Sequence, residues 1–159
     1  VFSTNWEASK RVLFPLVEEI FYKGRLGEAC GRFVLEQNGI AVADIDDAFR
    51  FEKFDFVLPG TLGDQEVFID FKHWKKQSDR MGWDSEKLVD WVFAKMEAID
   101  AKKAIVANVL PPDEGDYRET YRSKGGRRLL VVPALVKGDC SFDETVIQAI
   151  RRFTDGIAD

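Results

Sequence analysis

Apolar residues occur along the chain in two patterns, unbroken runs and helical stripes. Unbroken runs of strand length occupy residues 104–110 and 128–136. Because polar residues do not alternate with apolar ones in these runs, we expect strands that are covered on both faces, as in an α/β sheet. Pro133 interrupts the second run and predicts a sheet edge or a strand end there.

Apolar stripes at helical spacing predict helices around these runs. The stripes occupy residues 7–22 and 86–100, and residues 141–144 have the form of a capping box before a helix over residues 145–153. Lys95 is a charge within the 86–100 stripe, whose expected role is core packing. The order of elements favours an α/β fold with a mixed sheet flanked by helices.

The segment of residues 66–74 reads as a buried strand, yet it carries an acid and an amine two residues apart, Asp70 and Lys72. Residues two apart on a strand point to the same face, so these side chains should stand together, with Ile69 and Phe71 on the opposite face. A buried face with a carboxylate and an ammonium group must pair them, hydrate them or supply a metal ion. For an isolated Asp-x-Lys, a structural ion pair is the simplest interpretation.

A second acidic strand is predicted at residues 51–58, where an aromatic residue flanks Asp55 on each side. By alternation both aromatic side chains should face away from Asp55, which leaves one acid on the other face. The turn-rich stretch 59–65 then leads into the strand of Asp70. A hairpin at this stretch would bring Asp55 alongside Asp70.

A third acid, Glu28, lies near the start of a predicted helix. The apolar face of this helix is marked at helical spacing by Leu26, Cys30, Phe33 and Val34. Glu28 lies off the centre of that face, and Gly39 is the predicted stop of the helix.

A helix with Glu28, a strand with Asp55, a hairpin and a strand with Asp70 and Lys72 follow one another in this order. The order resembles the catalytic core of the PD-(D/E)xK nuclease superfamily. Within it, the likeness is closest to the Holliday-junction-resolvase type, in which a Lys-Gly run opens the glutamate helix and a Leu-Glu-x-x-Gly stretch closes it. The matching pieces are Lys23-Gly24 and residues 35–39.

The likeness covers roughly residues 20–76 by motif and the rest of the chain by element order. One departure is Phe54, which stands where a proline often precedes the aspartate. The resemblance implies a restriction-endonuclease-like core, with a central mixed β-sheet flanked by helices in αβββαβ order. We expect residues 1–159 to form a single nuclease domain, and the start at Val1 rather than Met suggests a domain of a longer protein.

The resemblance also implies a metal-dependent site. Asp55 and Asp70 would bind Mg²⁺, for which Mn²⁺ can substitute, and the backbone carbonyl of Phe71 would be a third ligand. Glu28 would bind a second metal ion or hold a water beside it. Lys72 would orient or help deprotonate the attacking water and stabilise the charge of the transition state. These residue types suit phosphodiester hydrolysis, which needs a nucleophile at neutral pH and a hard cation on the phosphate.

Several basic residues are candidates for contact with DNA phosphates: Arg25, Lys75, Lys76 and Arg127. Arg25 either contacts phosphate or pairs with an acid. The basic group from Arg118 to Arg128 is either a phosphate-contacting loop or a solvated surface, and the sequence leaves both open.

Composition fits this interpretation without requiring it. The net charge of −5 counts against an autonomous non-specific DNA binder, whose affinity comes mainly from phosphate neutralisation. No apolar run reaches the ~18 residues that span a bilayer, so no membrane partner is expected. Cys30 and Cys140 are too few for a disulfide framework, which favours a cytoplasmic setting.

Two functions from different classes remain open. The first is a Mg²⁺-dependent endonuclease acting on DNA, the cutting domain of a defence, repair or recombination protein. The second is a non-catalytic module that binds nucleic acid or protein on the same fold. For either function, the sequence leaves open two further kinds of partner. These are other domains or subunits of a larger protein, and a second copy of the chain.

Overall fold

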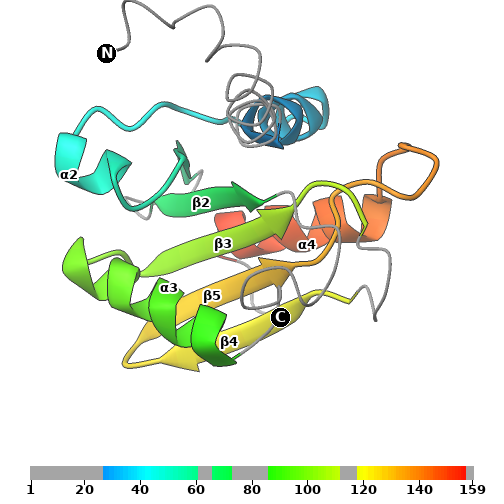
Figure 1. Cartoon of the computed structure of the whole chain (residues 1–159). Helices are drawn as coiled ribbons and strands as arrows, with labels where there is room; N and C mark the ends of the chain where they lie inside the picture. Colours follow the sequence, from blue (N-terminus) through cyan, green and yellow to red (C-terminus); the bar gives the residue numbers. More distant parts are fainter. Residues whose placement is uncertain (1–26, 61–65, 73–85, 112–117, 157–159) are drawn as a thin grey trace, which may run out of the picture.

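The computed structural model describes residues 27–60, 66–72, 86–111 and 118–156 (Figure 1). The predicted helix over residues 7–22 lies outside the described residues. The same is true of residues 61–65, the middle of the predicted hairpin turn.

The described residues form an α/β fold around one mixed, open sheet. Its five strands are β1 (Phe56–Leu58), β2 (Val67–Lys72), β3 (Lys103–Asn108), β4 (Thr120–Lys124) and β5 (Arg127–Val132), in the spatial order β1-β2-β3-β5-β4. The three central strands β2, β3 and β5 are parallel, and β1 and β4 pair antiparallel with them at the two edges. The expected mixed sheet is therefore confirmed.

Helices cover both faces of the sheet, as Figure 1 shows. The described helices are a helix over residues 27–37, here called the Glu28 helix, α2 (Ala48–Phe51), α3 (Glu86–Ala98) and α4 (Glu144–Asp155), and α2 has no buried residue. The Glu28 helix and α4 pack on one face, and α3 packs on the other. In the described part of the chain, no helix combines the length and apolarity that crossing a bilayer requires.

The two faces of the sheet belong to two separate hydrophobic clusters. In β2, Val67, Ile69 and Phe71 enter the cluster under α4, whereas Phe68 enters the cluster under α3. Every residue of β3 is buried, which the apolar run predicts for residues 104–107 and which extends to the polar residues Lys103 and Asn108 at the two ends of the strand. The side chains of Asp70 and Lys72 therefore share the face that α3 covers, opposite Ile69 and Phe71, as the alternation predicts.

The predicted strand over residues 51–58 is wrong in its first half. Residues 48–51 are helix α2, and the chain then turns, with the amides of Lys53 and Phe54 bonded to the Arg50 carbonyl. Strand β1 begins only at Phe56. Because of the turn, Phe54 packs under α3 and Phe56 packs on the other face, so the two aromatic neighbours of Asp55 do not share a face.

Beyond β1, one isolated β-bridge extends the sheet. Ala43 pairs with Val57 through two backbone hydrogen bonds of 2.8 and 3.0 Å. Among the described residues, two strands and this bridge precede α3, where the expected order has three strands.

The predicted face of the Glu28 helix is partly wrong. Val34 and Leu35 are buried, whereas Phe33 is 57% exposed. The helix ends as predicted, because Gly39 has a φ of +76°, a left-handed conformation that glycine adopts readily.

The basic group from Arg118 to Arg128 is a hairpin for most of its length, not a loop. Strands β4 and β5 pair from Thr120 to Val131, and Gly125 and Gly126 form the turn with positive φ values. The run predicted over residues 128–136 becomes β5, which ends just before Pro133 and lies inside the sheet. Pro133 therefore marks a strand end and not an edge strand.

The N-terminus of α4 is capped differently from the prediction. The N-cap is Asp143, whose carboxylate accepts a hydrogen bond from the Val146 amide. Ser141 instead donates to the carboxylate of Asp139 through its hydroxyl and its amide. The capping-box interpretation of residues 141–144 is wrong because the N-cap is Asp143, two residues after Ser141, which that motif would place at the N-cap.

Candidate functional site

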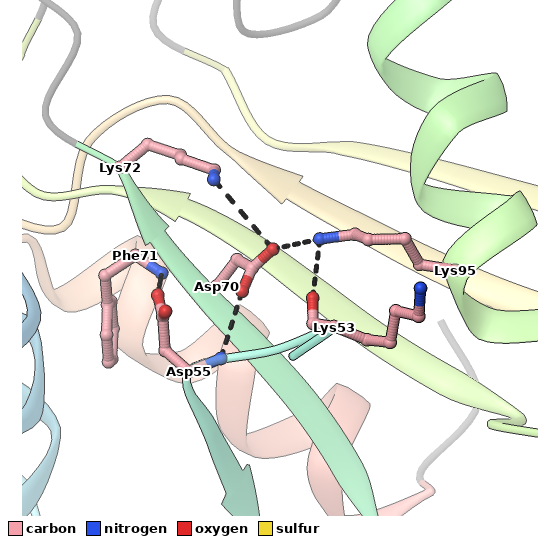
Figure 2. Close-up of polar contacts among 6 residues, drawn as sticks. All are labelled: Lys53, Asp55, Asp70, Phe71, Lys72 and Lys95. Carbon is pink, nitrogen blue, oxygen red and sulfur yellow. Dashed lines mark hydrogen bonds and ion pairs between the residues drawn. The ribbon is translucent and has the colours of Figure 1, made fainter. Parts of the chain in front are cut away.

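The pairing of β1 with β2 brings the two predicted aspartates together. Phe56 pairs with Ile69, so the next position along the register joins Asp55 to Asp70. The Asp55 amide donates to Asp70 Oδ1 at 3.0 Å, and the Phe71 amide donates to Asp55 Oδ2 at 2.8 Å (Figure 2). The Asp70 carboxylate is thus held by the backbone just before β1, and the Asp55 carboxylate by the backbone of β2, so the predicted meeting of the two acids is confirmed.

Lys72 lies next to Asp70, as the spacing of two residues predicts. Its Nζ is 3.9 Å from Asp70 Oδ2 and 5.6 Å from the centre of the Trp91 ring. Both residues stand near the carboxyl end of β2, which is parallel to β3 and β5. Open α/β sheets bind ligands at the carboxyl ends of their strands, so the location fits a functional site.

A second lysine, Lys95 of α3, reaches the same carboxylate. Its Nζ donates a short hydrogen bond to Asp70 Oδ2 and a second one, of 2.7 Å, to the backbone carbonyl of Lys53. Figure 2 shows Asp70 Oδ2 between the two ammonium groups, with Lys72 on one side and Lys95 on the other. The Lys95 ammonium also lies over Phe54 and Trp91, 4.5 and 4.4 Å from the ring centres.

The sequence contained a signal for Lys95 that its assignment to core packing overlooked. A lysine on the buried stripe of a helix needs a partner, because an unpaired buried ammonium group is costly. Trp91, which falls within the predicted helix over residues 86–100, is 45% exposed, and its ring lies beside the ammonium groups of both lysines.

Burial and repulsion by Asp70 dominate the electrostatics of Asp55. Burial, followed by the negative charge of Asp70, raises the pKa of Asp55 to about 7. The hydrogen bond from the Phe71 amide and the charge of Lys72 lower this pKa, and the charge of Glu28 raises it. Burial lowers the pKa of Lys95, and the charge and hydrogen bond of Asp70 oppose that change. The pair of acids is therefore a place where an additional cation would be stabilised.

Glu28 lies near this pair without joining it. Its half-buried side chain belongs to the helix that covers the opposite face of the sheet from α3, and its charge acts on Asp55. Among the described residues, no three or more acidic, histidine or cysteine side chains gather as a metal-binding group. The acidic side chains that do meet are Asp55 and Asp70, and a ligand role for Glu28 remains a prediction.

Of the four predicted DNA-contacting residues, Arg127 is the one that the structure describes, and it does not lie at the site. Arg25, Lys75 and Lys76 lie outside the described residues. Arg127 begins β5 at the opposite end of the parallel strands from Lys72, where its guanidinium donates to the Ala101 carbonyl at 2.7 Å. Arg127 therefore connects β5 to the start of β3, and contact with DNA would have to occur away from the two aspartates.

The donor set fits a divalent cation of the Mg²⁺ type. Mg²⁺ takes oxygen ligands and is usually held by one or two carboxylates together with water and phosphate. Asp55 and Asp70 supply two carboxylates, and burial, followed by the charge of Asp70, raises the pKa of Asp55, two effects that a bound cation would offset. The backbone carbonyl of Phe71, the third ligand that the resemblance implies, belongs to β2, the strand that carries Asp70.

Comparison with known proteins does not assign the chain to a family. No model of a known protein family matches the chain, and no curated protein sequence matches it significantly. The site's own geometry and chemistry are therefore what a functional assignment has to be built on.

Proposed function

We propose that this protein is a metal-dependent nuclease with a restriction-endonuclease-like core that hydrolyses DNA phosphodiester bonds. In this proposal it is the cutting domain of a defence, repair or recombination protein. The observation that carries the proposal is the meeting of Asp55, Asp70 and Lys72 at one end of β2. A resemblance to the PD-(D/E)xK superfamily supports it, because these residues occur in that family's order along the chain.

Each residue has a role that follows from its position. Asp55 and Asp70 would hold Mg²⁺, which supplies a nucleophile at neutral pH and neutralises charge on the phosphate. The hydrogen bonds from the Phe71 and Asp55 amides orient the two carboxylates before substrate arrives. Lys72 lies beside Asp70 with part of its side chain exposed, so its ammonium group can hold the attacking water and stabilise the negative charge that develops on the phosphate.

A second candidate function has a specific observation in its favour. Lys95 and Asp70 form a buried ion pair of the kind that can be purely structural. In that case the fold would be a non-catalytic module that binds nucleic acid or protein. The overall charge of −5 agrees with the protein-binding form of this alternative, because a surface that binds DNA gains most of its affinity from basic residues.

Cleavage assays separate the two candidates. Supercoiled plasmid and end-labelled single-stranded DNA are incubated with the protein in Mg²⁺, Mn²⁺ or EDTA. We expect cleavage with either metal, none in EDTA, and a loss of ~10²-fold or more in Asp70→Asn and Lys72→Ala. Lys102→Ala is the matched control, because that lysine is exposed and lies at the opposite end of the sheet.

Each other result has a definite meaning. Cleavage that persists in both site variants would show that the site is wrong or that a contaminating nuclease is present. If no form cleaves DNA and none binds Mg²⁺, the non-catalytic module is the better description.

A further inference from the structure

Lys95 occupies a position built to hold a cation. Two oxygen atoms accept hydrogen bonds from its Nζ, Asp70 Oδ2 and the Lys53 carbonyl oxygen. The rings of Phe54 and Trp91 lie within 4.5 Å of the same nitrogen, measured to the ring centres. Oxygen atoms and aromatic faces both attract positive charge. The four groups come from the α2–β1 turn, β2 and α3, so the tertiary fold assembles the position.

The side chain of Lys95 has little freedom to leave this position. It is 11% exposed, and the Asp70 side chain is 5% exposed. Lys72 approaches the same oxygen only to 3.9 Å and is 24% exposed. Of the two lysines, Lys95 is therefore the direct and more deeply buried partner of Asp70, and Lys72 is the more accessible one.

A divalent cation held by Asp70 would meet the Lys95 ammonium at the same carboxylate. Two cations at one oxygen repel each other, and the repulsion is strong where water is largely excluded. The side chains of Asp55, Asp70, Lys72 and Lys95 sum to no net charge when all are ionised. Removal of the Lys95 charge would leave a net negative site, which attracts a divalent cation more strongly.

We propose that Lys95 is an internal competitor for the divalent cation at Asp70, so that cation binding displaces its ammonium group and Lys95 sets the cation concentration the site requires. The proposal rests on the proposed function, because it assumes that Asp70 is a cation ligand. Lys95 is a positioning residue here: it holds Asp70 in place without the cation and weakens binding of the cation.

Calorimetric titration with Mg²⁺ and Mn²⁺, without DNA, tests the competition. The variants are Lys95→Gln, which keeps hydrogen-bond donors and removes the charge, and Lys95→Arg, which keeps the charge. Lys87→Gln is the matched control, because Lys87 is an exposed lysine of the same helix. We expect Lys95→Gln to bind both ions about tenfold more tightly than wild type, a change typical of one unit charge at a partly buried site. Lys95→Arg and Lys87→Gln should show no increase in affinity.

The outcomes separate this inference from the proposed function. If wild type binds Mg²⁺, Asp70→Asn does not, and Lys95→Gln binds no more tightly than wild type, the competition is refuted and the metal site stands. If no form binds either ion, the competition is refuted together with the metal-binding part of the proposed function.

A measurement on unmodified wild-type protein covers the case in which Lys95→Gln fails to fold. The protein is treated with an amine-acylating reagent, with and without saturating Mg²⁺, and labelling of each lysine is quantified by peptide mass spectrometry. Displacement predicts that Mg²⁺ increases labelling of Lys95 several-fold while labelling of Lys87 is unchanged. Equal labelling of Lys95 in the two conditions would refute the displacement.

Discussion

Gly31 lies directly against the ring of Phe71. A β-carbon at residue 31 would come within 2.3 Å of Phe71 Cδ1 and 2.6 Å of Cγ, much closer than two carbon atoms can approach. Gly31 belongs to the Glu28 helix, and Phe71 follows Asp70 in β2. The missing side chain at residue 31 therefore sets how closely the helix that carries Glu28 packs on the strand that carries Asp70.

Gly31→Ala should destabilise the protein. Although alanine favours a helix over glycine by about 1 kcal/mol, the new methyl group would force the buried Phe71 ring to move, at a typical cost of about 1–3 kcal/mol. We expect a net loss of about 1 kcal/mol or more in the free energy of unfolding, measured by urea denaturation. Gly138→Ala is the control, because a β-carbon there has no neighbour within 4 Å. A Gly31→Ala protein as stable as wild type would contradict the close packing.

The stability of the metal-free protein should fall as the pH rises from about 4 to about 7. The pKa of Asp55 rises from 3.8 to about 7 on folding, first because of burial and then because of the Asp70 charge. Between these values the native state holds a proton that the unfolded state has released, so raising the pH favours unfolding. The stabilisation that protonated Asp55 contributes is fully present below the pKa that Asp55 has in the unfolded chain. It is lost as the pH rises above the pKa that Asp55 has in the folded protein.

Urea denaturation in EDTA at pH 5 and pH 8 measures this effect. Asp55→Asn cannot titrate, so wild type should lose more stability between these two pH values than the variant does. A difference on the order of 1–3 kcal/mol is expected, since one pKa unit corresponds to about 1.4 kcal/mol. Equal losses in the two proteins would show that Asp55 does not titrate in this range.

Lys103 should stabilise the end of α4. This buried residue of β3 donates a hydrogen bond of 2.9 Å from Nζ to the Phe153 carbonyl, in the last turn of the helix, where the backbone carbonyls carry partial negative charge. Lys103→Met keeps the length of the side chain and removes the donor and the charge. We expect a loss of about 1–3 kcal/mol in the free energy of unfolding, measured by urea denaturation.

Its neighbour Lys102 is the matched control. The Lys102 side chain is 59% exposed and pairs with the exposed Asp100, so Lys102→Met should change stability by less than about 0.5 kcal/mol. If the two methionine variants were equally stable, the contact between Lys103 and α4 would contribute nothing measurable.

Patterns that depend on short stretches of chain were predictable from the sequence. Successive side chains of a strand point to opposite faces of the sheet, so Asp70 and Lys72, two residues apart in β2, lie on the same face. The antiparallel pairing of β1 with β2, two strands that are close in the sequence, joins Asp55 to Asp70. The burial of residues 104–107 of β3 follows from four consecutive apolar residues. In each case the geometry of the local backbone leaves few alternatives.

Tertiary structure alone decided which distant groups meet. Lys95 reaches Asp70 across 25 residues of sequence because α3 packs on the face of β2 that carries the acid, and the helical stripe specifies only that one side of α3 is buried. Phe54 changes face because the turn after α2 redirects the chain, which alternation cannot anticipate. Arg127 lies far from the site because β5 runs parallel to β2 and starts at the other end. Local patterns fix the direction of a side chain relative to its own backbone, whereas its partners depend on the packing of elements far apart in the chain.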